Sequence, residues 1–166
     1  MSHYIAGIDP GAEGYIAILG YNRVSLSYKY PTFYINNFYK LPRLDGQNLL
    51  NVYAMAAEYM NIDCAFIEEP GTYTKNMHSL ARQHREYAEI RAVYQFLKIK
   101  IHAITPKEWK NYFGLTKQKM GSIAKAAALV KNMPPLKLKD NDLAEACLIG
   151  IYGIVRENHK VINFYF

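Results

Sequence analysis

Two short apolar segments of this chain each end in acidic residues and are stopped by a Pro-Gly pair. Residues 3–11 read HYIAGIDPG, and residues 63–71 read DCAFIEEPG. Short β-rich runs closed by turn formers are typical of strands, and the second run is apolar enough for a buried strand. The sequence therefore predicts two strands that end in carboxylates.

The remaining periodicities predict further elements in the order βββαβαβααα. Pro31, Pro42 and nearby Asn residues indicate a loop or irregular segment over 31–45. The predicted strands are 3–9, 13–19, 24–30, 63–67 and 99–104, and the predicted helices are 47–60, 77–98, a short one from 106, 117–131, and one from about 140 to 157. This order indicates an α/β protein with a mixed five-stranded sheet flanked by helices, in a single domain over residues 1–166.

The charge balance favours a polyanionic partner such as nucleic acid. The 20 Lys and Arg exceed the 14 Asp and Glu, which gives a formal net charge of +6 and a pI near 9.2. The charge alone is equally compatible with a solvated basic surface. Some of the 15 Tyr could stack on unpaired bases, although most are expected at core and rim positions.

Cysteine usage and hydropathy indicate a soluble cytoplasmic protein. Cys64 and Cys147 lie in apolar runs and are expected to be buried thiols in a reducing compartment. Asp9 and Pro10 interrupt the apolar stretch that a signal peptide needs, and no run of eighteen apolar residues occurs. We therefore expect no membrane partner.

Four acidic residues fall at the ends of predicted elements and could form one site. Asp9 and Glu68 close strands, whereas Asp142 and Glu145 begin the last helix, three residues apart and on one face. If the two strands are neighbours and the helix packs across them, the carboxylates meet. Such a cluster suits two Mg²⁺ ions for phosphodiester hydrolysis, because clustered carboxylates repel one another unless cations neutralise them.

Each acid also has an ordinary structural interpretation. Asp9 before a Pro-Gly pair could be a turn former, and Asp142 could be only a helix cap. Glu68 could belong to a solvated loop mouth, and Asp140 competes with Asp142 as the first acid of the last helix. Glu145 is harder to explain in this way, because it interrupts or borders an apolar face.

Five segments in order resemble the RuvC-type Holliday junction resolvases, and more closely their phage-encoded relatives. They are GIDPG at 7–11 followed by Gly14, AFIEE at 65–69, ITPKEWK at 104–110, KMGSIAKAA at 119–127, and DNDLAEACLIGIYG at 140–153. The resemblance implies an RNase H-like fold, a homodimer, and paired incisions in junction DNA with Mg²⁺ or Mn²⁺, two ions per site. The family carboxylates carry over to Asp9, Glu68, Asp142 and Glu145.

The resemblance also suggests DNA contacts. Lys119 matches a family lysine, and Lys117, Lys110, Arg82 and Arg85 are further candidates for phosphate contacts, although each could be a solvated surface charge.

Two departures from the family pattern bear on the chemistry and the substrate. The last acid is often Asp in the family, and the longer arm of Glu145 could reach its metal differently. Bacterial members place an aromatic residue three positions after the catalytic Glu, where this chain has Gly71 and its nearest ring is Tyr73. Forks and flaps are therefore candidate substrates beside four-way junctions.

Three alternative functions follow from the same pattern. They are a junction-binding module without cutting activity, an RNase H acting on RNA:DNA hybrids, and a nucleotide-binding fold of the actin and sugar-kinase type. Proteins of this last type are much longer and need a second phosphate loop that this chain lacks. We expect Trp109 to be a core residue rather than a base-stacking one. We expect the helix 77–98, with Tyr87, Val93, Tyr94 and Phe96, to form the dimer surface.

Overall fold

The computed structural model describes residues 3–10, 14–21, 33–40, 61–72, 77–116 and 118–162 of the chain. Its strands are β1 (His3–Asp9), β2 (Tyr15–Tyr21), β3 (Phe33–Lys40), β4 (Ile62–Glu68), β5 (Lys100–Ile104) and β6 (Val130–Lys131). Its helices are α2 (Met77–Phe96), α3 (Pro106–Tyr112), α4 (Lys119–Leu129) and α5 (Asn141–Ile162), with a 3-10 turn η2 (Leu138–Asp140). The predicted strand 24–30, the predicted helix 47–60, and the candidate contacts Tyr73 and Lys117 lie outside the described residues.

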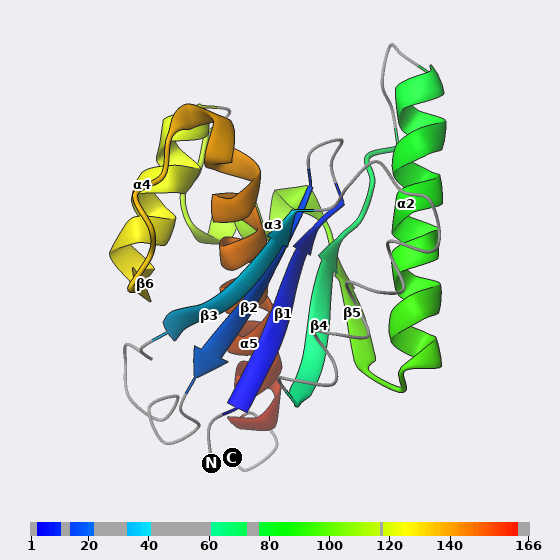
Figure 1. The fold of residues 1–166 in the computed structure, drawn as a ribbon, viewed down its shortest axis with the longest axis horizontal. Helices are drawn as coiled ribbons and strands as arrows, with labels where there is room; N and C mark the ends of the chain where they lie inside the picture. The colour runs from blue at the N-terminus through cyan, green and yellow to red at the C-terminus, as the bar shows by residue number, and fades with distance from the viewer. Residues whose placement is uncertain are drawn as a thin grey trace.

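The strands form one mixed sheet in the order β5-β4-β1-β2-β3-β6 (Figure 1). β2 pairs antiparallel with β1 and β3, whereas β4 pairs parallel with β1 and β5, and β6 pairs parallel with β3. This arrangement confirms the expected fold class, a mixed sheet flanked by helices. The two-residue β6 adds a sixth strand to the five that were predicted.

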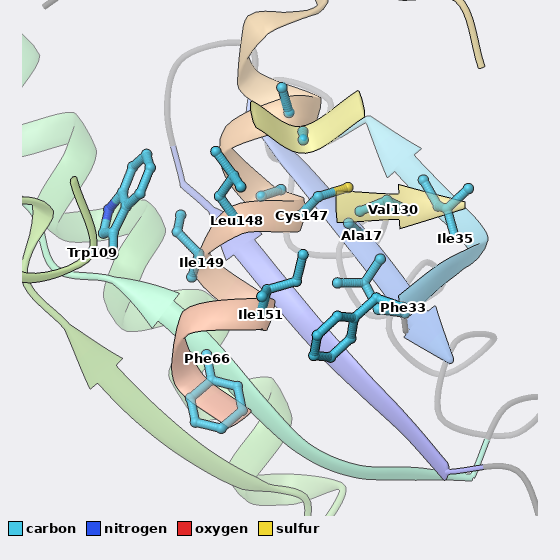
Figure 2. Packing of buried hydrophobic residues seen from close by; sticks show 14 of the residues in the cluster. Ala17, Phe33, Ile35, Phe66, Trp109, Val130, Cys147, Leu148, Ile149 and Ile151 are labelled. Carbon is cyan, nitrogen blue, oxygen red and sulfur yellow. The ribbon is translucent and has the colours of Figure 1, made fainter. Parts of the chain in front are cut away.

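Both faces of the sheet are buried because the central strands are apolar on both sides. Ile5 of β1 packs into the core shared with α5, whereas its neighbours Ala6 and Ile8 pack into the core shared with α2. β2 divides its side chains in the same alternating way. α5 runs behind the sheet in Figure 1, and Figure 2 shows α5 residues such as Leu148 and Ile151 within the core on that side.

α5 approaches β1 very closely at two glycines. A Cβ atom on Gly7 would collide with the backbone oxygen of Ala146 and would lie 2.7 Å from the backbone nitrogen of Gly150. A Cβ atom on Gly150 would lie 3.3 Å from the Cα of Gly7. The glycine of the GIDPG segment is therefore required where the helix backbone meets the strand backbone.

The prediction of an irregular segment over 31–45 was wrong, because β3 occupies Phe33–Lys40. Phe33 and Ile35 are buried at 2% and 7% exposure, and the strand pairs along β2 with a register shift between Ile18 and Leu19. The Asn residues that suggested a loop are tolerated because the hydrogen bonds to β2 and the burial of alternate side chains outweigh local propensity.

The predicted helix 117–131 also needed correction at its end. α4 stops at Leu129, and Val130 and Lys131 leave the helix to pair with Phe33 and Tyr34 of β3. Val130 has an extended backbone and is 3% exposed, so a β-branched side chain is buried at the sheet edge rather than on a helix face.

α2 does not present the apolar surface that was expected for dimerisation. Val93 and Tyr94 are buried in the core between α2 and the sheet, and Tyr87 packs against that core. Of the four residues proposed, only Phe96 is strongly exposed, at 80%. The excess of apolar residues in the helix is therefore mostly accounted for by the core.

None of the helices in the described part of the chain combines the length and the apolar character needed to cross a bilayer.

Replacing Gly7 with Ala is expected to destabilise the protein by about 1–3 kcal/mol or more, since the new methyl group must displace the backbone of α5. Gly121→Ala is the matched control, because its Cβ would meet only Leu115 Cδ2 at 3.5 Å. The control should keep or slightly raise stability in urea denaturation. Equal midpoints for wild type and Gly7→Ala would contradict the close helix-strand contact.

Candidate active site

Asp9 and Glu68 end two neighbouring parallel strands on the face of the sheet that α5 covers. In the register of β1 and β4, Ile8 pairs with Ile67, and both pack on the α2 side. Because side chains alternate along a strand, the residues that follow each of them face α5. The pairing of β1 with β4 thus meets the condition, stated from the sequence, that these two strands be neighbours.

The start of α5 lies level with these strand ends. Gly150 contacts Gly7, and α5 runs back from there to Glu145, five residues or about 7.5 Å along the helix axis. Asp9 lies two residues beyond Gly7, about 6.6 Å along the strand. The glycine contact therefore brings the first turns of α5, with Asp142 and Glu145, to the end of β1.

The Glu68 carboxyl lies in an environment that disfavours its charge. Burial raises the pKa of its carboxyl, and the negative charges of Glu145 and Asp142 act in the same direction. The indole of Trp109 and the ammonium of Lys110 oppose this rise in pKa. Since these effects fall off with distance, three of the four candidate acids and Lys110 belong to one neighbourhood.

The Glu145 carboxylate is held by two partners from neighbouring helices. The Ser122 hydroxyl of α4 donates a hydrogen bond to Glu145 Oε1 at 3.1 Å, and Lys110 Nζ of α3 lies 3.3 Å from Glu145 Oε2. The Glu145 side chain is 14% exposed, so these partners compensate a charge with little access to water. This accounts for an acid within an otherwise apolar helix face.

Asp140 and Asp142 have different surroundings. The Asp140 side chain accepts a hydrogen bond from the backbone N–H of Lys137 at 2.8 Å, which closes the η2 turn. Asp142 lies in the first turn of α5, where the helix dipole favours an acid. Its negative charge contributes to the raised pKa of Glu68. The charge of Asp142 therefore influences Glu68, whereas Asp140 is engaged in a local turn.

Asp9 and Glu68 both line a small pocket of about 110 Å³. Asp9 is 8% exposed, and Gln83 of α2 is also among the lining residues. The remaining lining residues are Pro10, Glu69, Pro70 and Gly71. The two strand-end acids therefore border a recess in which Asp9 has little contact with solvent.

The donor set fits a hard divalent cation by its chemistry. Asp9, Glu68, Asp142 and Glu145 offer only carboxylate oxygens, which Mg²⁺ and Mn²⁺ prefer. In the described residues, no three or more His, Cys, Asp or Glu side chains converge as a ready-made ligand group. Lys110 instead supplies the positive charge beside Glu145.

The other predicted DNA contacts are spread over the surface. Lys119 is exposed at the first position of α4. Arg82 and Arg85 of α2 are paired within their own helix, at 3.8 Å from Glu86 and 3.6 Å from Glu89. The Arg85–Glu89 pair is exposed and such pairs are weak, so Arg85 could exchange its partner for phosphate, whereas the Glu86 side chain that pairs with Arg82 is only 9% exposed.

Two side chains at the site were not anticipated as functional. Trp109 is fully buried, as expected of a core residue, but its indole also donates a 2.6 Å hydrogen bond to Glu68 Oε2. Ser122 is 3% exposed and bonds to Glu145. The signals available in the sequence were a buried indole, which needs an acceptor, and a hydroxyl within the apolar stretch of α4.

Glu68→Gln is expected to raise the melting temperature in EDTA at about pH 7.5. The raised pKa means that the folded state binds a proton at Glu68 more tightly than the unfolded chain, so ionisation at higher pH costs stability. The gain should disappear as the pH falls below the ordinary Glu pKa of 4.5. Glu69→Gln serves as the control, and a lower melting temperature for Glu68→Gln at neutral pH would refute this account.

No protein-family model matches the sequence, and no curated protein matches it either. Solved structures of Holliday junction resolvases resemble the fold. RuvC of T. thermophilus in complex with a Holliday junction substrate aligns with a TM-score of 0.67 at 11% identity, over 95% of this chain and 96% of that chain. The yeast mitochondrial Holliday junction resolvase Ydc2 aligns with a TM-score of 0.62 at 14% identity, over 99% and 85% of the two chains.

The fowlpox virus resolvase, solved with substrate Holliday junction DNA, aligns with a TM-score of 0.51 at 18% identity, over 89% of this chain and 95% of that chain. At these identities the likeness establishes the fold and not the activity. The protein therefore has the RNase H-like fold that RuvC and other Holliday junction resolvases share.

Proposed function

We propose that this protein is a divalent-metal-dependent endodeoxyribonuclease that cleaves Holliday junctions and other branched DNA, with residues 1–166 forming one nuclease domain. The observation that carries the proposal is the placement of four acids. Asp9 and Glu68 end adjacent strands under the helix that begins with Asp142 and Glu145. Two of the structures that share this fold contain Holliday junction DNA, which supports branched DNA as the substrate class.

The four carboxylates are the proposed ligands of Mg²⁺ or Mn²⁺. Two such ions, when bound, supply activation of water and stabilisation of the departing 3′ oxygen. The reaction forms a bond between the water oxygen and phosphorus, breaks the bond to the 3′ oxygen, and leaves 5′-phosphate and 3′-hydroxyl ends. Asp142 and Glu145, three residues apart on one helix face, are suited to share a cation.

The basic residues are proposed to position the DNA. Lys110 already lies against the carboxylates, 3.3 Å from Glu145, so its ammonium is close to where a scissile phosphate would lie. Lys119, exposed at the start of α4, and Arg82 and Arg85 on α2 are the outer phosphate contacts. Contacts of this type fix the register of the nucleic acid and make binding salt-dependent.

A homodimer completes the proposal. A symmetric four-way junction needs two incisions on opposing strands, and a two-fold assembly of identical sites supplies both. We place the protein with the phage-encoded branch of these enzymes and in the cytoplasm of the host cell, on the resemblance in its motifs.

The decisive experiment compares wild type with Asp9→Asn on a labelled four-way junction, a fork, a linear duplex and an RNA:DNA hybrid. Wild type should cut the branched substrates in Mg²⁺ or Mn²⁺, and the variant should bind the junction without cutting. Cutting of the hybrid alone would identify an RNase H-type enzyme. Junction binding by wild type without cleavage in either metal would identify a non-cutting binding module.

The choice between Asp142 and Asp140 gives a separate prediction. Asp142→Asn should lower cleavage by more than the about 10–100-fold that loss of an outer partner of a metal ligand costs. Asp140→Asn keeps an oxygen for the Lys137 N–H and should cut at nearly the wild-type rate. Single-turnover cleavage of a four-way junction measures both, and the reverse ranking would show that Asp140 is the ligand.

A further inference from the structure

The indole of Trp109 joins the hydrophobic core to the candidate active site. Its ring is fully buried, and Figure 2 shows it beside α5, near Ile149. Its Nε1–H donates to Glu68 Oε2 at 2.6 Å across 41 residues of sequence. A buried indole needs an acceptor, and here the acceptor is one of the four acids.

The local fold fixes the indole relative to Glu68. β4 and β5 pair up to Glu68 and Ile104, and the Glu69 N–H donates to the Ile104 carbonyl at 2.9 Å. The next residue, Thr105, caps α3 in a reciprocal capping box with Glu108. Trp109 therefore lies in the first turns of a capped helix that directly follows β5, and β5 is hydrogen-bonded to the end of β4.

The same ring also contacts Lys110. The Lys110 ammonium lies 4.9 Å from the centroid of the Trp109 ring, within the range of a cation–π interaction, and 3.3 Å from Glu145 Oε2. Trp109 thus contacts Glu68 of β4 through its N–H, and it contacts Lys110 through the face of its ring. The two groups lie on different elements of the site, and one rigid ring connects them.

We propose that Trp109 is a positioning residue that orients the Glu68 carboxylate for metal binding and places the Lys110 ammonium. This inference rests on the proposed metal-dependent nuclease function. The indole has one donor and no charge, so it occupies one of the about four acceptor positions of the carboxylate without repelling an incoming cation. Glu68 Oε1 would then remain available to a cation.

A packing role and a positioning role make different demands on the ring. Packing needs its volume, whereas orientation of Glu68 needs its N–H. Trp109 is the single Trp of the chain, so biosynthetic replacement of tryptophan by β-(3-benzothienyl)alanine changes this site alone and exchanges the N–H for sulfur in a ring of similar size. Replacement by 5-fluorotryptophan, which keeps the N–H, is the matched control.

The experiment measures Mn²⁺ affinity by calorimetry, melting temperature in EDTA, and cleavage of a four-way junction for the three proteins. In the benzothienyl protein, both the Mn²⁺ affinity and the cleavage rate are expected to be about 10–100-fold lower than in wild type. This is the loss expected when an outer partner of a metal ligand is removed. The fluorinated control should match wild type. Mn²⁺ affinity and cleavage within about twofold of wild type in the benzothienyl protein would overturn the proposal.

The two proposals fail in different ways. If wild type binds Mn²⁺ but cuts no branched DNA, the proposed function fails, and the comparison of Mn²⁺ affinities still decides the role of Trp109. If wild type binds no Mn²⁺, the positioning role is overturned as well.

A second measurement applies if the benzothienyl protein does not fold. The single indole ¹H–¹⁵N resonance of wild type should move on addition of Mg²⁺ and in Glu68→Ala. An indole resonance unchanged in both cases would refute the proposal.

Discussion

The contact between Gly7 and Gly150 is the constraint on which the rest of the site depends. It allows the backbone of α5 to lie directly against β1, at a separation that any side chain at Gly7 would prevent. Gly7 is two residues before Asp9, and Gly150 is five residues after Glu145. The same contact that buries the apolar face of α5 therefore brings the acids of the helix to the acids at the strand ends.

Bringing carboxylates together within a core has an electrostatic cost that the surrounding residues reduce. The indole of Trp109 and the ammonium of Lys110 oppose the rise in the pKa of Glu68, and Ser122 and Lys110 hold Glu145. All three partners come from α3 and α4, which are packed on the same side as α5. The helices that complete the core thus also compensate the negative charge of the proposed metal site. Such compensation is expected because an active site often lowers the stability of the fold locally.

Much of the fold was predictable because its central strands and long helices have clear periodicity. The segment HYIAGID and the run before Glu68 are strands as predicted, and α2 begins at Met77 as predicted. β3 was missed because its Asn residues and flanking prolines indicate a loop, and its pairing with β2 and β6 makes it a strand. Val93 and Tyr94 were assigned to a dimer surface because sequence alone does not show how much apolar area the sheet can cover.

By itself, the sequence determined which residues are acids at element ends, since turn formers and helix periodicity mark those ends locally. It also determined that Trp109 is buried, since a large ring on a short amphipathic helix is seldom exposed. Only the tertiary structure decided that the charge of Asp142 rather than Asp140 influences Glu68, that Lys110 pairs with Glu145, and that the indole bonds to Glu68. These relations join residues 35 or more positions apart, and their distances are set by strand order and by the approach of α5, which no local pattern encodes.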